Sequence, residues 1–133
     1  MVKNLERSLD FYVKGLSFEI KMDWKPGGRI EWCWLERDGV PLMLQEYRKE
    51  FVPDEKQGVG VSICFMCKDS LALYKEFLQN GLLPQEPFVG NKLWVVQIAD
   101  PDGYNICFES LTDVPEETLY TVDKRRKHKI DTK

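Results

Sequence analysis

The fold is decided by a short motif that occurs twice, as Asp38-Gly39-Val40-Pro41-Leu42 and as Asp102-Gly103-Tyr104-Asn105-Ile106. Asp-Gly between apolar, alternating segments is typical of a tight β-hairpin turn. Upstream of each copy lies a second related pair, Ser8-Leu9-Asp10-Phe11-Tyr12 and Ser70-Leu71-Ala72-Leu73-Tyr74. The offsets of the two pairs are 64 and 62 residues, so the chain is predicted to hold two copies of one structural unit.

Helix and strand signals around these motifs repeat in the same order. Asn4 and Asp69 are predicted N-caps, and Gly15 and Gly81 are predicted to end the two helices. The predicted helices cover about residues 4–14 and 69–80, and the predicted strands about 18–24, 29–37, 40–46, 61–67, 94–99 and 104–110, with a short extended piece near 88–89. The last twenty residues have no clear period and receive no assignment.

This order predicts an α+β fold of two βαβββ modules, whose mixed sheet curves into a cup with the helices on the outside. We expect a single domain over residues 1–111, built from repeats at about 1–50 and 59–111, followed by a C-terminal tail at 112–133. By the repeat offset, the first strand of the first module would start upstream of Met1, so that only Val2 and Lys3 remain of it.

Composition indicates one soluble, cytoplasmic domain. The chain has 133 residues, of which 43% are hydrophobic, and no uncharged apolar run approaches the roughly 18 residues of a membrane-spanning helix. We therefore expect no membrane partner. The one histidine, His128, lies in the basic tail, which argues against a catalytic histidine triad or a histidine-rich zinc site in the body of the protein.

Charge is unevenly distributed along the chain. Six of the 19 basic residues but only two of the 22 acidic residues lie from position 121 on, which leaves 13 basic and 20 acidic residues, a net charge of −7, before it. An acidic body repels nucleic acid and attracts a cationic ligand. We expect the basic run at 124–129 to be a solvated terminus, with contact to an anionic surface as the alternative.

The four cysteines lie in apolar segments without any sign of secretion, so reduced thiols are expected. Cys64 and Cys67 have the spacing of a redox or zinc motif. Their segment is predicted to be a strand, and side chains three residues apart on a strand point to opposite faces. We therefore favour a structural role for both thiols.

The Asp38-Gly39 turn predicts which side chains share a face. A two-residue turn pairs Trp34 with Met43 and Trp32 with Gln45, and it leaves Cys33, Leu35, Leu42 and Leu44 for the face under the helix. Carrying these faces over by 64 residues places Val96, Ile98, Cys107 and Glu109 with the first group. The predicted ligand-binding residues are Trp32, Trp34, Met43, Gln45, Ser62, Cys107 and Glu109. Indole faces and a carboxylate suit a flat, cationic ligand; alternatively, the two tryptophans only fill space between sheets or at a dimer contact.

Residues 4–12, 15–19, 42–46 and 99–106 together resemble the vicinal oxygen chelate superfamily, the glyoxalase, bleomycin-resistance and dioxygenase group. In its enzymes four inward residues, usually His, Glu or Gln, bind one divalent metal. The resemblance carries these positions to Met43, Ser62, Cys107 and the absent first strand. Thioether, hydroxyl and thiol groups do not suit Mg²⁺, Mn²⁺, Ni²⁺ or Fe²⁺, so we expect no metal and no cofactor.

The resemblance is therefore nearest to the metal-free bleomycin-resistance-like branch. It implies a homodimer that holds a small, flat organic molecule, with a cationic one favoured, in a groove at the dimer interface, without catalytic residues. The alternative is a metal-dependent lyase, isomerase or dioxygenase of the same superfamily, and a scaffold or dimerisation module remains a third possibility.

Overall fold

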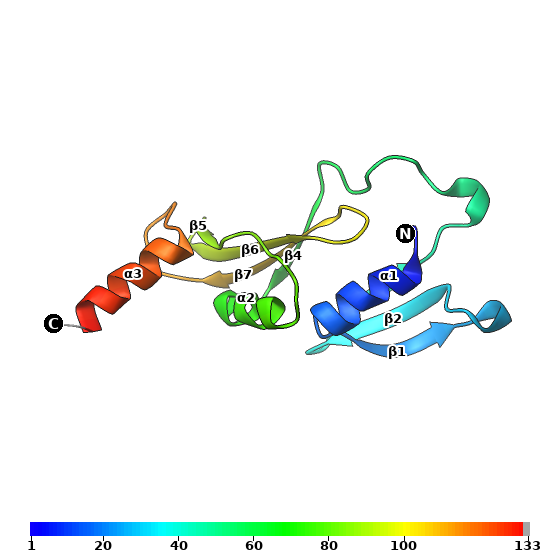
Figure 1. The fold of residues 1–133 in the computed structure, drawn as a ribbon, viewed down its shortest axis with the longest axis horizontal. Helices are drawn as coiled ribbons and strands as arrows, with labels where there is room; N and C mark the ends of the chain where they lie inside the picture. The colour runs from blue at the N-terminus through cyan, green and yellow to red at the C-terminus, as the bar shows by residue number, and fades with distance from the viewer. Residues whose placement is uncertain (132–133) are drawn as a thin grey trace. The chain divides into compact units, whose positions relative to one another are not determined.

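The computed structural model describes residues 1–131 and divides into two compact units (Figure 1). Unit 1 comprises Met1–Gly60 and Asp100–Tyr104, and unit 2 comprises Val61–Ala99 and Asn105–Lys133. The helical segments are α1 (Leu5–Leu9), η1 (Asp10–Gly15), η2 (Pro26–Gly28), η3 (Lys49–Phe51), α2 (Ser70–Gln79) and α3 (Tyr120–Asp131). The strands are β1 (Glu19–Trp24), β2 (Trp32–Arg37), β3 (Val40–Gln45), β4 (Ser62–Met66), β5 (Phe88–Gly90), β6 (Leu93–Ala99) and β7 (Asn105–Leu111). The α+β class is confirmed.

Unit 1 packs one helical layer on a three-stranded antiparallel sheet of order β1-β2-β3. Asn4 caps α1 as predicted, because its side chain accepts a hydrogen bond from the backbone N–H of Arg7. The helix then widens into the π-helical turn η1, which buries Phe11 and Tyr12. Under this layer the sheet buries Cys33, Leu35 and Leu44.

Unit 2 has a four-stranded sheet of order β4-β7-β6-β5, in which β4 runs parallel to β7. Asp69 caps α2 by accepting from the backbone N–H of Ala72. The core between α2 and the sheet is aromatic: Phe108 lies with its ring centroid 5.0 Å from that of Phe77 and 5.5 Å from that of Phe65. This stacking shows which face of β4 and β7 is turned toward the helix.

The two sheets share one plan. In unit 2 the first strand, β4, pairs in parallel with the last strand, β7. In unit 1 the corresponding place is taken by Val2, which makes an isolated parallel bridge with Glu46 just after β3. The backbone N–H of Val2 donates to Gln45 at 2.8 Å, and the backbone N–H of Tyr47 donates to Val2 at 3.0 Å.

The predicted pairing of the first hairpin is confirmed, whereas the transfer of its faces to the second hairpin is right for β7 and wrong for β6. Trp34 lies opposite Met43 and Trp32 opposite Gln45. In unit 2, however, Val96 pairs with Phe108 and Ile98 pairs with Ile106, so Val96 and Ile98 belong to the face under α2. Side chains alternate along a strand, so the residues of β6 that accompany Cys107 and Glu109 are Gln97 and Val95.

The basic tail forms the helix α3, for which the sequence analysis made no assignment, and its described basic residues are exposed, as expected of a solvated segment. The Tyr120 ring that begins α3 packs edge-on against Tyr74, with centroids 5.5 Å apart, and against Trp94. The hydroxyl and backbone N–H of Thr121 both donate to Glu86, which lies before β5. Aromatic packing and this side-chain bond therefore start the helix. Within residues 1–131, no helix is long and apolar enough to cross a membrane.

Candidate functional site

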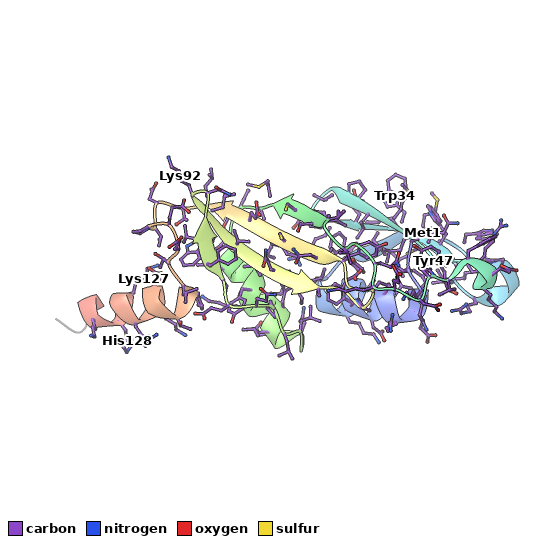
Figure 2. All side chains as sticks on the ribbon, turned by 90° about the horizontal axis from the view of Figure 1, so that it is seen from above. Met1, Trp34, Tyr47, Lys92, Lys127 and His128 are labelled. Carbon is purple, nitrogen blue, oxygen red and sulfur yellow. The ribbon has the colours of Figure 1, made fainter. Side chains whose placement is uncertain are left out.

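The exposed face of the unit 1 sheet carries two rows of large side chains. The first row runs across the strands as Met22, Trp34 and Met43, and the second as Trp24, Trp32 and Gln45. Met22 is 58% exposed, Trp34 38% and Met43 62%. Figure 2 shows Trp34 on the side of this sheet away from α1. We call these six residues the aromatic platform.

The sequence analysis missed Met22 and Trp24. Strict alternation along residues 18–24 gives Ile20, Met22 and Trp24 one common face, but it does not say which face of the next strand they accompany. In the structure the register shifts between Ile20 and Met22, so that Ile20 pairs with Leu35 while Met22 pairs with Trp34. This irregularity turns Met22 and Trp24 onto the platform. Because the Pro26–Gly28 turn is irregular, the sequence alone did not predict how β1 pairs with β2.

The platform lies on a sheet whose other face is packed against the helical layer. The opposite face of the same strands is buried, with Cys33 and Leu35 at 0% exposure. The Arg37 guanidinium at the end of β2 donates a 2.7 Å hydrogen bond to the backbone oxygen of Leu16. A flat surface of indole and thioether groups on a fixed sheet can stack against an aromatic ring and attract a cation.

Unit 2 holds the remaining predicted residues, and they share one face of its sheet, the face away from α2. Ser62 lies opposite Asn105, and its hydroxyl accepts a 2.8 Å hydrogen bond from the Asn105 amide. Cys107 is buried and Glu109 is half-buried on the same face of β7. Unit 2 thus brings Ser62, Cys107 and Glu109 together, and unit 1 brings the other four together.

A third thiol joins this group. Cys64 is exposed and lies directly opposite Cys107, and the ligand atoms of Cys64, Cys107 and Glu109 all lie within 4.8 Å of one another. Loss of hydration around its sulfur, together with the neighbouring Cys107 and Glu109, raises the pKa of the Cys64 thiol to about 11. The sequence analysis favoured a structural role for Cys64 and did not select it. Cys67 lies outside the group, and its thiol donates to the backbone oxygen of Glu109.

The positions that the family resemblance offers to a divalent metal do not fit the hard cations of its enzymes. Met43 supplies a thioether, Ser62 a hydroxyl already bonded to Asn105, and Cys107 a buried thiol. Mg²⁺ and Mn²⁺ prefer oxygen ligands with charge, and Ni²⁺ and Fe²⁺ are typically held by imidazole and carboxylate groups.

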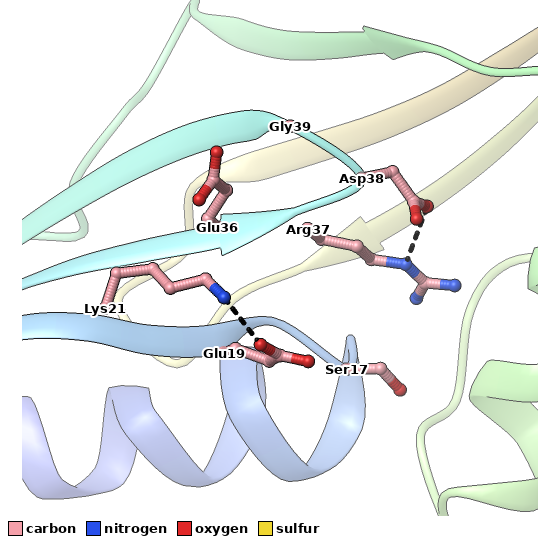
Figure 3. Close-up of a pocket in the computed structure, with 7 residues that line it drawn as sticks. All are labelled: Ser17, Glu19, Lys21, Glu36, Arg37, Asp38 and Gly39. Atoms are coloured by element: carbon pink, nitrogen blue, oxygen red, sulfur yellow. Dashed lines mark hydrogen bonds and ion pairs between the residues drawn. The ribbon is translucent and has the colours of Figure 1, made fainter.

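A separate hollow of about 410 Å³ opens at the Asp38-Gly39 end of the unit 1 sheet (Figure 3). Its charges pair with each other: Lys21 lies 2.8 Å from Glu19, and Arg37 lies 3.6 Å from Asp38. The lining residues are Ser17, Glu19, Lys21, Glu36, Arg37, Asp38 and Gly39. This polar hollow contains none of the predicted ligand-binding residues and lacks the apolar lining typical of organic-ligand pockets.

Comparisons with known proteins agree on the fold. A family model described as Glyoxalase/Bleomycin resistance protein/Dioxygenase superfamily matches residues 1–108. The structure of TnmS3, an antibiotic binding protein from Streptomyces sp. CB03234, is similar with a TM-score of 0.66 and 19% identity, over 84% of this chain and 89% of that chain.

Two further structures show the same likeness. TioX from Micromonospora sp. ML1 has a TM-score of 0.66 and 15% identity, over 83% of this chain and 92% of that one. An integron cassette protein from the mobile metagenome of the Halifax Harbour sewage outfall has a TM-score of 0.63 and 26% identity, over 83% and 91%. No curated protein sequence matches this chain.

Proposed function

The chain belongs to the Glyoxalase/Bleomycin resistance protein/Dioxygenase superfamily, and we propose that it is a binding protein that holds a small, flat organic molecule without changing it. Two copies of the chain form the groove that receives the molecule. Affinity comes from stacking and burial, and a cationic ligand is preferred. No cofactor takes part.

The observation that carries this proposal is the aromatic platform of unit 1. Three tryptophans and two methionines lie side by side on one sheet face, and Trp24, Met22 and Met43 are each more than half exposed. Exposed apolar side chains gathered on one face typically mark a binding surface. A planar, electron-poor ligand gains most from such a face, because indole attracts cations and stacks on rings.

Charge and relatives support the same class of ligand. The chain before residue 121 carries a net charge of −7, which favours approach of a cation. Glu109 supplies a carboxylate that can fix the orientation of a positive group. Among the similar structures, TnmS3 is described as an antibiotic binding protein. We extend that activity to this chain as part of the proposal, since the two share fold but little sequence.

We further propose that the protein works as a cytoplasmic homodimer. Met22, Trp24 and Met43 of the platform are exposed apolar side chains that a second copy would cover, and symmetric pairing is the commonest form of oligomer. All four cysteines are thiols, as expected in a reducing compartment.

The test combines a ligand-binding titration with native mass spectrometry. The reduced protein is titrated with planar aromatic cations while its tryptophan fluorescence is recorded, and native mass spectrometry reports subunit number and retained molecules. Saturable quenching with two ligands per dimer supports the proposal. A monodisperse monomer at micromolar concentration would contradict the dimer, and absence of saturable quenching across neutral and cationic ring systems would contradict the binding.

A further inference from the structure

We infer that Cys64, Cys107 and Glu109 of unit 2 form a binding site for a thiophilic divalent cation, with Zn²⁺ as the natural occupant. The inference goes beyond the proposed function and shares Glu109 with it, whereas the aromatic platform, which carries the proposed function, lies in unit 1 and the three metal ligands lie in unit 2. Of the hard-cation positions discussed above only Cys107 takes part, and Cys64 and Glu109 are new to the set.

The strand register brings the two thiols together. β4 and β7 run parallel, and Cys64 lies directly opposite Cys107. Glu109 is two residues farther along β7, so that all three side chains leave the same face of the sheet. The arrangement is fixed by backbone pairing and does not require a loop to close.

The distances suit tetrahedral zinc after a small adjustment. The three ligand atoms lie within 4.8 Å of one another. With Zn–S bonds of about 2.3 Å and Zn–O bonds of about 2.1 Å, ligand atoms on a tetrahedral ion are roughly 3.6 to 3.8 Å apart. Side-chain rotation of about 1 Å at each ligand atom therefore closes the site. The fourth position remains for water or for a donor atom of a small molecule.

The surroundings favour the metal-bound form. The Asn105 amide donates to the Cys107 sulfur at 3.7 Å, an interaction that supports a thiolate. Cys107 is buried and Cys64 is exposed, so one ligand anchors the ion while the other leaves it accessible. Three groups that each carry negative charge when ionised repel one another, and a divalent cation removes that repulsion.

The choice of cation follows from the donors. The two thiolates are soft ligands that select Zn²⁺ over Mg²⁺ or Ca²⁺, and the carboxylate is a hard ligand that Zn²⁺ also accepts. Binding must release the thiol protons, so affinity is expected to fall as pH falls.

The experiment uses the reduced full-length protein under anaerobic conditions, titrated with Co²⁺ as a spectroscopic probe and then with Zn²⁺. One Co²⁺ per chain, with sulfur-to-metal charge-transfer absorption that Zn²⁺ abolishes, supports the site. Cys64→Ser should lower the affinity at least tenfold and reduce the charge-transfer intensity by about half. Glu109→Gln should weaken binding but keep the thiolate absorption.

Cys67→Ser is the matched control, because it removes a thiol of the same strand region that lies outside the group. It should leave stoichiometry and spectrum unchanged. Circular dichroism checks that each variant is folded, and Cys64→Ser changes only an exposed side chain. The inference is overturned if the wild-type protein binds no stoichiometric Co²⁺ or Zn²⁺, or if Cys64→Ser and Cys67→Ser bind equally.

Discussion

The Tyr12 hydroxyl donates a 2.8 Å hydrogen bond to Asp100 Oδ2, a carboxylate 88 residues away, and both side chains are buried. Asp100 Oδ1 in turn accepts from the backbone N–H groups of Asp102 and Tyr104. One carboxylate therefore joins the end of the first helical layer to the turn at residues 100–104.

Tyr12→Phe is expected to lower the free energy of unfolding by about 1 to 3 kcal/mol, because it leaves a buried carboxylate without one of its donors. Urea denaturation measures the change. Tyr104→Phe is the control, since the Tyr104 hydroxyl donates to the Met1 backbone oxygen at an exposed position, where the net loss should be small. Equal effects of the two variants would show that burial of the Tyr12–Asp100 bond has no special weight.

Trp34→Ala is expected to weaken binding of a planar aromatic cation by about 1 to 3 kcal/mol, if stacking on the platform supplies the affinity. Isothermal titration calorimetry on the wild-type and variant proteins measures it. Trp24→Ala, in the neighbouring row, should act in the same direction. Phe51→Ala serves as the control, because Phe51 is a 70% exposed aromatic residue of η3, outside the sheet. A ligand lost equally in all three variants would not be held by the platform.

Cys64 should alkylate slowly although it is exposed. Its pKa of about 11, against an ordinary 9.0, lowers the thiolate fraction near pH 8 by about a hundredfold relative to the same cysteine in the urea-unfolded chain. Because the thiolate forms only as pH rises toward this pKa, the iodoacetamide rate should rise about tenfold per pH unit between 8 and 10. Peptide mass spectrometry follows the labelling.

Glu109→Gln is expected to speed Cys64 labelling, because it removes a neighbouring negative charge and so lowers the thiol pKa. The measurement is made without added metal. Identical rates for folded wild type, folded variant and unfolded chain would contradict the interaction between Cys64 and Glu109.

Alanine substitutions at two glycines can distinguish the cost of backbone strain from the cost of a steric clash. Gly39 (φ +79°) and Gly58 (φ +71°) both have left-handed backbones, so alanine at either position should cost about 1 to 2 kcal/mol of folding free energy. A Cβ on Gly39 meets open space, whereas on Gly58 it would lie 2.5 Å from the Tyr104 ring. Gly58→Ala should therefore destabilise by about 1 to 3 kcal/mol more than Gly39→Ala. Thermal unfolding of the two variants compares them; equal costs would mean that the Tyr104 ring moves freely.

Local signals in the sequence were sufficient for most elements. Asn4 and Asp69 cap their helices as predicted, and the two-residue turn set the pairing of Trp34 with Met43. These features depend on neighbours within a few residues, so the sequence contains them directly.

In the second hairpin, local signals did not predict which face each side chain of β6 occupies. Its strands pair Ala99 with Asn105, so the connection has five residues, whereas Arg37 pairs with Val40 across two. The difference is an odd number, and a shift of one residue turns every side chain of β6 to the opposite face. In the longer turn the Asp100 carboxylate accepts hydrogen bonds from the backbone N–H of Tyr104 and from the hydroxyl of the distant Tyr12. The offset between the two repeats does not predict these bonds.

The residues of the candidate site also divide into those that local signals predict and those that depend on nonlocal pairing. Residues on β2, β3, β4 and β7 could be assigned to faces, because alternation and one turn are enough for that. Met22 and Trp24 required the irregular pairing between Ile20 and Met22, and the Cys64–Cys107 contact required knowledge that β4 runs parallel to β7 in that register. The start of α3 depends on Tyr120 packing against Trp94, which is equally nonlocal.

Unit 1 includes Asp100–Tyr104, the segment that connects β6 and β7 of unit 2. Neither unit is thus an uninterrupted piece of polypeptide. A fragment that ends at Gly60 would lack the carboxylates that accept from the Tyr12 hydroxyl and the Lys3 backbone N–H. Proteolytic nicking near residue 60 should leave two pieces that remain associated, whereas the first sixty residues produced by themselves should fold only when the other piece is supplied in trans.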